Sequence, residues 1–192
     1  MRWLRNNWLY IVLALGVAFA VHVASVAFLP QLIMTRALAK MSGLNGYNTM
    51  THTARATSAS RAVVRPSPDL LYSVCPFDLG KGDTLLVSVT GMPKSYWSIS
   101  VFDAETNNIF ALNNSAVPSG SADVAIQQPL PPGSLSKTMP PPHPDDRSWY
   151  FAHVTTPTAR GLVLIRTLIV DDKSLAAIDR ARRTATCGLY RY

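Results

Sequence analysis

The stretch YWSISVFDA, residues 96–104, decides the fold class of this chain. Trp97, Ile99 and Val101 alternate with the other positions, so they lie on one face of an extended chain. Such an alternation with a period of two is typical of a β-strand that buries one face. The sequence therefore predicts a core strand here.

Six further stretches share this character, and turn sequences such as GKGD and GMPKS separate several of them. These stretches are residues 70–79, 84–91, 108–113, 123–129, 148–156 and 161–172. Seven short strands with turn signals between them predict a mainly β chain, folded as an antiparallel β-sandwich or jelly-roll-like domain. Residues 173–185 have the composition of a short C-terminal helix, with Asp171 and Asp172 as the expected N-terminal cap.

The N-terminal part of the chain holds much of its apolar excess. Hydrophobic residues make up 48 % of the 192 residues, and charged residues only 15 %. Residues 8–29 contain no Asp, Glu, Lys or Arg, and as a helix they would measure about 33 Å, enough for a hydrocarbon core of about 30 Å. A cleavable signal peptide has a shorter apolar core, of about 7–15 residues. Although Ala18-Phe19-Ala20 resembles a cleavage site, the length favours a retained transmembrane signal anchor.

The charges beside this span predict its orientation. Arg2 and Arg5 precede the span, and positive charge close to a span tends to stay in the cytoplasm. We therefore expect residues 1–7 in the cytoplasm, a single pass through a bacterial inner membrane, and residues 61–192 as a periplasmic β-sandwich domain.

Two other segments have their own composition. Residues 30–60 predict a short juxtamembrane helix that ends at Gly43, followed by a stretch rich in Asn, Thr and Ser that is either a spacer or an irregular leading strand. Residues 128–146 hold seven of the 14 prolines and predict a long, stiff loop. That loop is either a docking or lid element or a surface crossover between two sheets.

The two cysteines, Cys75 and Cys187, lie far apart and have no metal-type spacing. In an exported domain such a pair is expected to oxidise, and a disulfide closing so long a loop would contribute about 4–5 kcal/mol. The alternative is two small buried thiols that never meet.

The net charge of +7 is compatible with anionic headgroups or anionic polymers as neighbours. Nucleic acid is not expected as a partner, because the basic residues are scattered and no recognition motif accompanies them.

The stretch RPSPDLLYS, residues 65–73, is the first candidate site. In one interpretation Arg65, Asp69, Tyr72 and Arg166 line a ligand-binding cleft, with an arginine lowering the pKa of Asp69. In the other, which we favour, Asp69 is a turn residue, Tyr72 a core aromatic and Arg166 a buried ion-pair partner.

Two other patterns give little support to a phosphate-binding or metal-binding site. GKGDT, residues 80–84, lacks the full phosphate-loop pattern and predicts a hairpin turn. His143, Asp145 and Asp146 are interrupted by a proline and make a poor metal site. We therefore expect no metal, no cofactor and no catalytic residue.

Within the span, Gly16, Ala20 and Ala24 recur every four residues and form a small-residue stripe suited to helix–helix packing. His22 lies inside the apolar segment, where an ionisable side chain either contacts a partner or stays neutral and hydrogen-bonded.

Three blocks, RPSPDLLYSVCPFDL, YWSISVFD and TNNIF, resemble the bacterial domain-of-unknown-function family 1254 (DUF1254). The tail RGLVLIRTLIVDD also resembles its frequent companion, family 1214. The resemblance implies a largely β domain and a separate companion protein of family 1214, and it brings no catalytic residue.

Three hypotheses of function follow from the sequence. The first is a non-catalytic subunit or interaction module of an envelope complex, attached to the inner membrane. The second is an envelope enzyme or ligand-binding protein for a carbohydrate or small anion. The third is a lipid-surface protein that uses the helix carrying Arg36 and Lys40.

Overall fold

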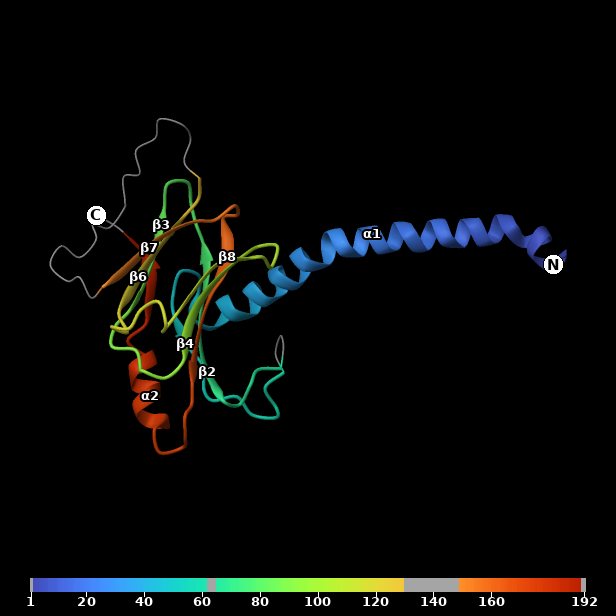
Figure 1. Cartoon of the computed structure of the whole chain (residues 1–192). Coiled ribbons are helices and arrows are strands. Elements are labelled where there is room, and N and C mark those ends of the chain that lie inside the picture. The colour runs from blue at the N-terminus through green and yellow to red at the C-terminus, as the bar shows by residue number, and fades with distance from the viewer. Residues whose placement is uncertain (1, 62–64, 130–148, 191–192) are drawn as a thin grey trace.

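The computed structural model describes residues 2–61, 65–129 and 149–190, and consists of a long N-terminal helix and two packed β-sheets (Figure 1). The helices are α1 (Arg2–Asn45) and α2 (Leu175–Arg182). The strands are β1 (Thr51–His52), β2 (Leu70–Asp78), β3 (Thr84–Val89), β4 (Trp97–Asp103), β5 (Asn108–Asn113), β6 (Ala122–Gln127), β7 (Tyr150–Thr155), β8 (Arg160–Leu168) and β9 (Thr186–Leu189). The mainly β architecture predicted from the sequence is confirmed, with the short C-terminal helix in place.

The two sheets have five and four strands. The order in the first, sheet A, is β1-β2-β8-β4-β5, and in the second, sheet B, it is β7-β6-β3-β9. Every pair is antiparallel except β6–β7, which is parallel, so sheet B is mixed rather than purely antiparallel. Parallel neighbours need a long crossover, and the chain between Gln127 and Tyr150 is long enough to supply one.

The core lies between the sheets and follows the alternation of the sequence. Trp97, Ile99 and Val101 of β4 are fully buried, as their spacing predicted, and they belong to one apolar cluster with residues of β3 and β6. Cys75 on β2 and Cys187 on β9 form a disulfide with Cα atoms 6.5 Å apart. Because β2 belongs to sheet A and β9 to sheet B, this bond joins the two sheets covalently.

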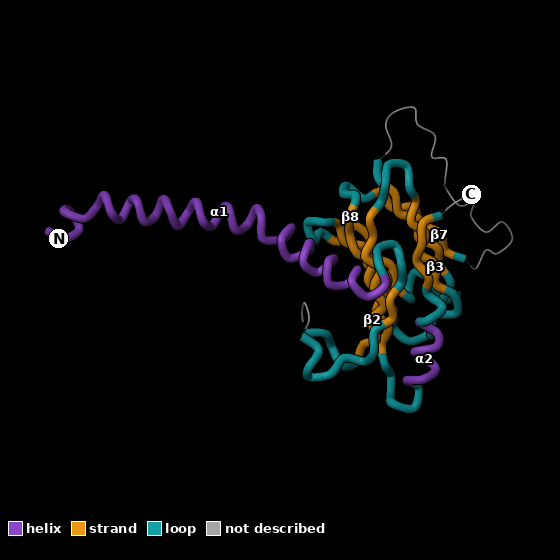
Figure 2. The backbone as a smooth tube through the Cα atoms, turned by 180° about the vertical axis from the view of Figure 1, so that it is seen from behind, coloured by secondary structure: helices purple, strands orange, loops and turns teal. Residues whose placement is uncertain are grey.

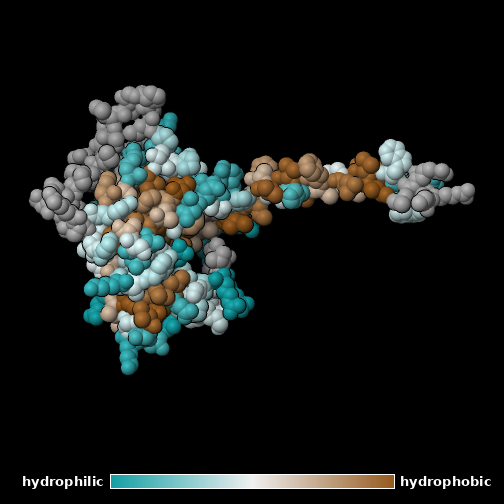
Figure 3. Space-filling view, viewed as in Figure 1, coloured by the Kyte–Doolittle hydropathy of each residue, from teal (hydrophilic) through white to brown (hydrophobic). Residues whose placement is uncertain are grey.

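Helix α1 continues further than the sequence indicated. The expected separate helix after residue 30 is part of one helix, with Pro30 inside it. Its N-terminal part projects away from the sandwich, as Figures 1 and 2 both show, and its apolar side chains are exposed (Figure 3). This part is long and apolar enough to span a membrane.

The last turns of α1 pack on the outer face of sheet A. Met34 and Leu38 form a buried cluster with Val74 of β2 and Leu162 of β8. This apolar contact explains why the helix persists through Pro30, since packing outweighs the hydrogen bond that a proline removes.

The sandwich begins earlier in the chain than residue 61, where its boundary was predicted. Strand β1 pairs with β2 through Thr51 and Val74, and Asn48 N donates a hydrogen bond of 2.8 Å to Pro76 O. The stretch at residues 43–60, predicted as a spacer or an irregular leading strand, therefore contains an edge strand of sheet A.

Helix α2 starts at Leu175, two residues later than the sequence suggested. Its N-cap residue is Ser174, and the Asp171 carboxylate accepts a 2.6 Å hydrogen bond from Ser174 N in the preceding turn. Residues 186–189, for which no strand was predicted, form β9 at the edge of sheet B.

Candidate functional site

A groove of about 880 Å³ runs along the outer face of sheet A, beside the last turns of α1. Its floor is the outward face of β2, β4 and β8, with the side chains of Val74, Phe102 and Leu164. These residues face outward because their neighbours Cys75, Val101 and Val163 fill the core between the sheets.

Two segments form the walls of this groove. Helix α1 supplies one, with Ile33, Met34, Ala37, Lys40 and Met41. The segment after β1 supplies the other, with Thr53, Ala54, Ala59, Ser60, Arg61, Arg65 and Pro66. Figures 1 and 2 show that the backbones of α1 and of the segment after β1 lie on the same side of the sandwich.

Arg55 fixes the second wall to the body of the domain. Its Nε donates to Pro68 O at 2.9 Å, and its guanidinium forms a 2.7 Å ion pair with Asp172 in the connection between β8 and α2. Both side chains of the pair are partly or largely exposed, so the contact positions the segment more than it stabilises the fold.

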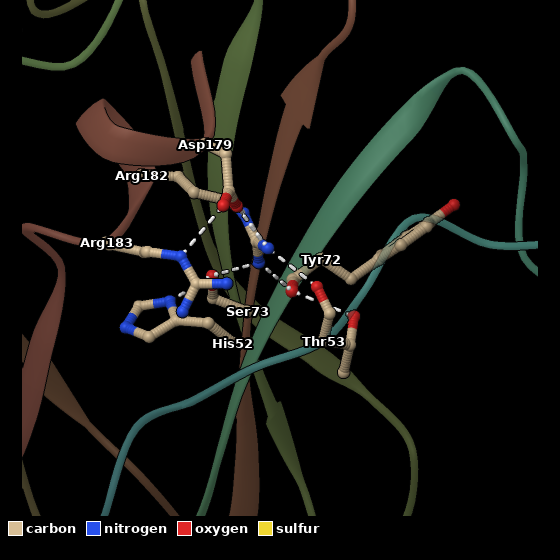
Figure 4. Close-up of polar contacts among 7 residues, drawn as sticks. All are labelled: His52, Thr53, Tyr72, Ser73, Asp179, Arg182 and Arg183. Carbon is tan, nitrogen blue, oxygen red and sulfur yellow. Dashed lines mark hydrogen bonds and ion pairs between the residues drawn. The ribbon is translucent and has the colours of Figure 1, made fainter. Parts of the chain in front are cut away.

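A buried arginine of α2, Arg182, connects the second wall of the groove to its floor on β2. Arg182 of α2 is only 1 % exposed, yet its guanidinium donates to Tyr72 O and Thr53 O, each at 2.6 Å (Figure 4). It also donates to Asp179 at 2.7 Å, which pairs its charge. A buried cation with several carbonyl acceptors and one carboxylate is a structural tie between α2, β2 and the segment after β1.

The groups around Arg182 have shifted pKa values. Burial lowers the pKa of the Arg182 guanidinium from its usual high value, although Asp179 opposes that shift. For Asp179, burial acts to raise the pKa, but hydrogen bonds from Arg183 and Arg182 outweigh it and hold the pKa below its usual value. Burial, followed by the charges of Arg182 and Arg183, lowers the pKa of His52, whose Nδ1 lies 2.8 Å from Ser73 Oγ. This cluster is therefore a charged pair beside a histidine whose lowered pKa favours its neutral form.

The structure brings three of the four predicted ligand-binding residues into one region. Arg65 and Tyr72 line the groove, and Arg166 lies opposite Tyr72 on the adjacent strand β8, on the same outward face. Asp69 lies outside the groove, exposed before β2, where its carbonyl accepts a 2.9 Å hydrogen bond from Ile169 N.

These residues have local roles as well. The Tyr72 hydroxyl accepts a 2.9 Å hydrogen bond from Ser67 N, and the ring points away from Arg182 in Figure 4. Within the described residues, the Arg166 guanidinium contacts Ser100 Oγ at 3.4 Å rather than a carboxylate. The expected ion pair of Arg166 is therefore not observed there.

The predicted membrane-packing residues Gly16, Ala20, Ala24 and His22 all lie on the projecting, exposed part of α1. The prediction for the proline-rich segment falls mainly on residues 130–148, outside the described residues, and so does the weak metal site of His143, Asp145 and Asp146. Among the residues that the structure describes, no group of three or more His, Cys, Asp or Glu side chains could hold a metal ion.

Sequence reasoning missed the groove and Arg182. The groove combines three segments that are distant in the chain, so no local pattern marks it. Arg182 lies in DRARR, residues 179–183, where the spacing to Asp179 indicates an ordinary exposed helix pair. Only the packing of α2 shows that one of these arginines is buried.

Fold and groove together define a class of protein, a two-sheet β-sandwich with a groove beside a long apolar helix. The chain belongs to the family DUF1254, described as proteins of unknown function, which matches residues 47–188. No protein with a curated description matches the chain.

Two solved structures are similar to this chain. One is the VPA0106 protein from Vibrio parahaemolyticus, with 13 % identity over 88 % of this chain and a TM-score of 0.57. The other is an uncharacterised protein from Burkholderia cenocepacia, with 13 % identity over 74 % of this chain and a TM-score of 0.45. The chain spans 38 % and 34 % of the length of these two proteins. At this identity, the first shows a shared fold alone.

Proposed function

We propose that this protein is a membrane-attached, non-catalytic module of a bacterial envelope assembly, with its β-sandwich in the periplasm. The observation that carries the proposal is the continuity of α1. One helix includes the exposed apolar stretch and the turns that pack Met34 and Leu38 against Val74 and Leu162. A sandwich attached in this way is held at the membrane surface in a defined orientation rather than on a loose linker.

Placement in the periplasm of the inner membrane is supported by charge and by redox chemistry. Arg2 and Arg5 precede the apolar stretch, which favours a cytoplasmic N-terminus. The Cys75–Cys187 disulfide is of the kind that persists in an oxidising compartment.

The proposed partner is a companion protein of family 1214, because the chain resembles the short, membrane-anchored form of family 1254, which pairs with a separate companion. A sheet edge is a ready docking surface, because an edge strand carries backbone groups without a neighbour on one side. Strand β5 ends sheet A, and Ala111 on it is exposed. We therefore place the companion against β5.

Photo-cross-linking in native membranes tests this function. A photoreactive amino acid at Ala111 is expected to capture one protein in stoichiometric amount, identified by mass spectrometry as a member of family 1214. The same amino acid at Ala176, exposed on α2, serves as the matched control and is expected to capture no such protein. Recovery of the protein as a lone monomer from both positions would contradict the proposal.

A further inference from the structure

The groove on the outer face of sheet A has the chemistry of a lipid-binding site. Its floor and α1 wall are largely apolar, with Met34, Val74 and Leu164 among the lining side chains. Its volume of about 880 Å³ falls within the range of about 300–1,000 Å³ that small-molecule sites occupy. An apolar groove of this size suits an acyl chain.

The charges that line the groove all have one sign. Of the described lining residues, the charged ones are Lys40, Arg61 and Arg65, and all three are exposed. Arg61 Nε donates to Ser58 O at 3.2 Å, a neutral carbonyl, and no carboxylate among the described residues forms an ion pair with it. An occupant with an apolar body and an acidic head would therefore match both parts of the groove.

The position of the groove indicates where such an occupant comes from. Ile33 and Met41 follow the apolar stretch ending at Leu29 by four and twelve residues, which corresponds to about 6 Å and 18 Å along the helix. The groove thus begins at the depth of the lipid headgroups and extends away from the bilayer. A lipid leaving the bilayer along α1 would reach it directly.

We propose that this groove binds an acidic phospholipid from the adjoining membrane, with an acyl chain on the outer face of sheet A beside α1 and the headgroup at Arg61 and Arg65. The inference rests on the membrane placement proposed above but not on the companion protein. It also gives Arg65 and Tyr72 a shared role, because both line the same groove.

Photolabelling in nanodiscs tests the proposal. The full chain is placed in phosphatidylcholine nanodiscs with increasing phosphatidylglycerol, a fraction of which carries a photoreactive group at the end of one acyl chain. Labels are expected on Val74 and Leu164 as well as on residues 8–29. The floor of the groove lies on the sandwich, so a lipid that stays in the bilayer cannot label it.

The charge requirement is tested by the double variant Arg61→Gln/Arg65→Gln. Each basic residue near an anionic surface is worth about a fivefold change in affinity. The double variant is therefore expected to need at least about ten times more phosphatidylglycerol for the same labelling of the floor. The matched control Lys173→Gln/Arg180→Gln removes the same two charges from exposed positions at and just before α2 and is expected to change nothing.

The steric requirement is tested by Ala54→Trp, which places an indole at an exposed position that lines the groove. Labelling of the floor is expected to disappear, while labelling of residues 8–29 remains. Ala176→Trp, on α2, is the control for the bulk of the side chain.

Three outcomes would overturn the inference. Labels confined to residues 8–29 would show that no lipid enters the groove. The second outcome is that photoreactive phosphatidylcholine labels the floor as strongly as photoreactive phosphatidylglycerol does, and that the double variant leaves this labelling unchanged. It would exclude an acidic headgroup. Absence of labels from residues 8–29 as well would contradict the membrane placement, and with it both proposals.

Discussion

Arg182 shows how much of this fold depends on one polar side chain. Its guanidinium satisfies Thr53 O and Tyr72 O, and it pairs with Asp179 while almost fully buried. Removing the guanidinium takes the hydrogen bond away from Thr53 O, whereas Tyr72 O keeps the hydrogen bonds from Thr53 N and Thr53 Oγ1. Asp179 keeps its ion pair with Arg183. We therefore expect Arg182→Met to lower the free energy of unfolding by about 1–3 kcal/mol, the cost of a buried polar group that loses its hydrogen-bond partner.

Arg183 provides the matched control for that measurement. It contacts the same carboxylate, at 2.8 Å, but its side chain is 52 % exposed. Arg183→Met is therefore expected to cost less than about 1 kcal/mol. Urea unfolding of the full chain in detergent, followed by tryptophan fluorescence, compares the two. Equal losses of unfolding free energy in both variants would show that the buried Arg182 stabilises the fold no more than the exposed Arg183 does.

His52 predicts a pH dependence of stability. Its pKa in the folded protein lies below the ordinary value of 6.5, so the unfolded chain binds the proton more readily. Stability is therefore highest above the unfolded pKa and falls as pH drops through it toward the folded pKa. The lowered pKa of Asp179 acts in a separate window, because its contribution is lost only in more acidic solution.

The measurement is urea unfolding between about pH 7.5 and pH 5.5, around the reference pKa of histidine. The free energy of unfolding of the native sequence is expected to fall across this range, and His52→Gln is expected to flatten the slope. His153→Gln, at an exposed position on β7, should keep the slope unchanged. If the free energy of unfolding of His52→Gln still falls with falling pH as in the native sequence, the pH dependence comes from another group.

At the scale of elements, the contact between α1 and sheet A can be tested with two leucines of the same helix. Leu38 is 3 % exposed in the cluster with Val74 and Leu162, whereas Leu32 is 48 % exposed. Leu38→Ala is expected to cost about 2 kcal/mol or more through the cavity it leaves. Hydrogen exchange of residues 34–45 should become faster in Leu38→Ala and stay unchanged in Leu32→Ala. No difference between the two variants would mean that the helix does not depend on this contact.

The same scale shows what the sequence could predict. Strands β2 to β8 were predictable, because buried and exposed positions alternate along several of them and turn signals separate most of them. Strands β1 and β9 are two and four residues long and carry no alternation of their own. They form only because β2 and β3 offer them a partner edge, which is a tertiary effect.

The candidate site was predictable only in part, for a similar reason. The stretch RPSPDLLYS drew attention to Arg65 and Tyr72, and both line the groove. The apolar wall of α1 could not be assigned to that site, since residues 33–41 are distant in sequence and Pro30 suggested a helix boundary. The continuation of the helix past Pro30 and its place beside the groove both depend on the packing of α1 on sheet A.

For the whole molecule, four consecutive residues of β2 connect most of its parts. Tyr72 O accepts from Arg182 of α2, and Ser73 Oγ contacts His52 of β1. Val74 packs against α1, and Cys75 is bonded to β9 of sheet B. The projecting helix, both sheets and α2 are thus tied to one segment, which makes the sandwich and its attachment a single mechanical unit.

Among the described residues, the disulfide is the one covalent cross-link of this unit. Its redox state also reports on the compartment in which the sandwich lies. When cell extracts are denatured and treated with a maleimide polymer before reduction, this chain is expected to show no reactive thiol, as an exported protein requires.

The bond closes a loop of sequence separation 112, so its loss should lower the free energy of unfolding by up to about 4–5 kcal/mol. Cys187→Ala is expected to show this loss and to be insensitive to reductant, whereas the native sequence should reach the same stability only after reduction. Two reactive thiols in the native sequence would contradict both the bond and the placement of the sandwich outside the cytoplasm.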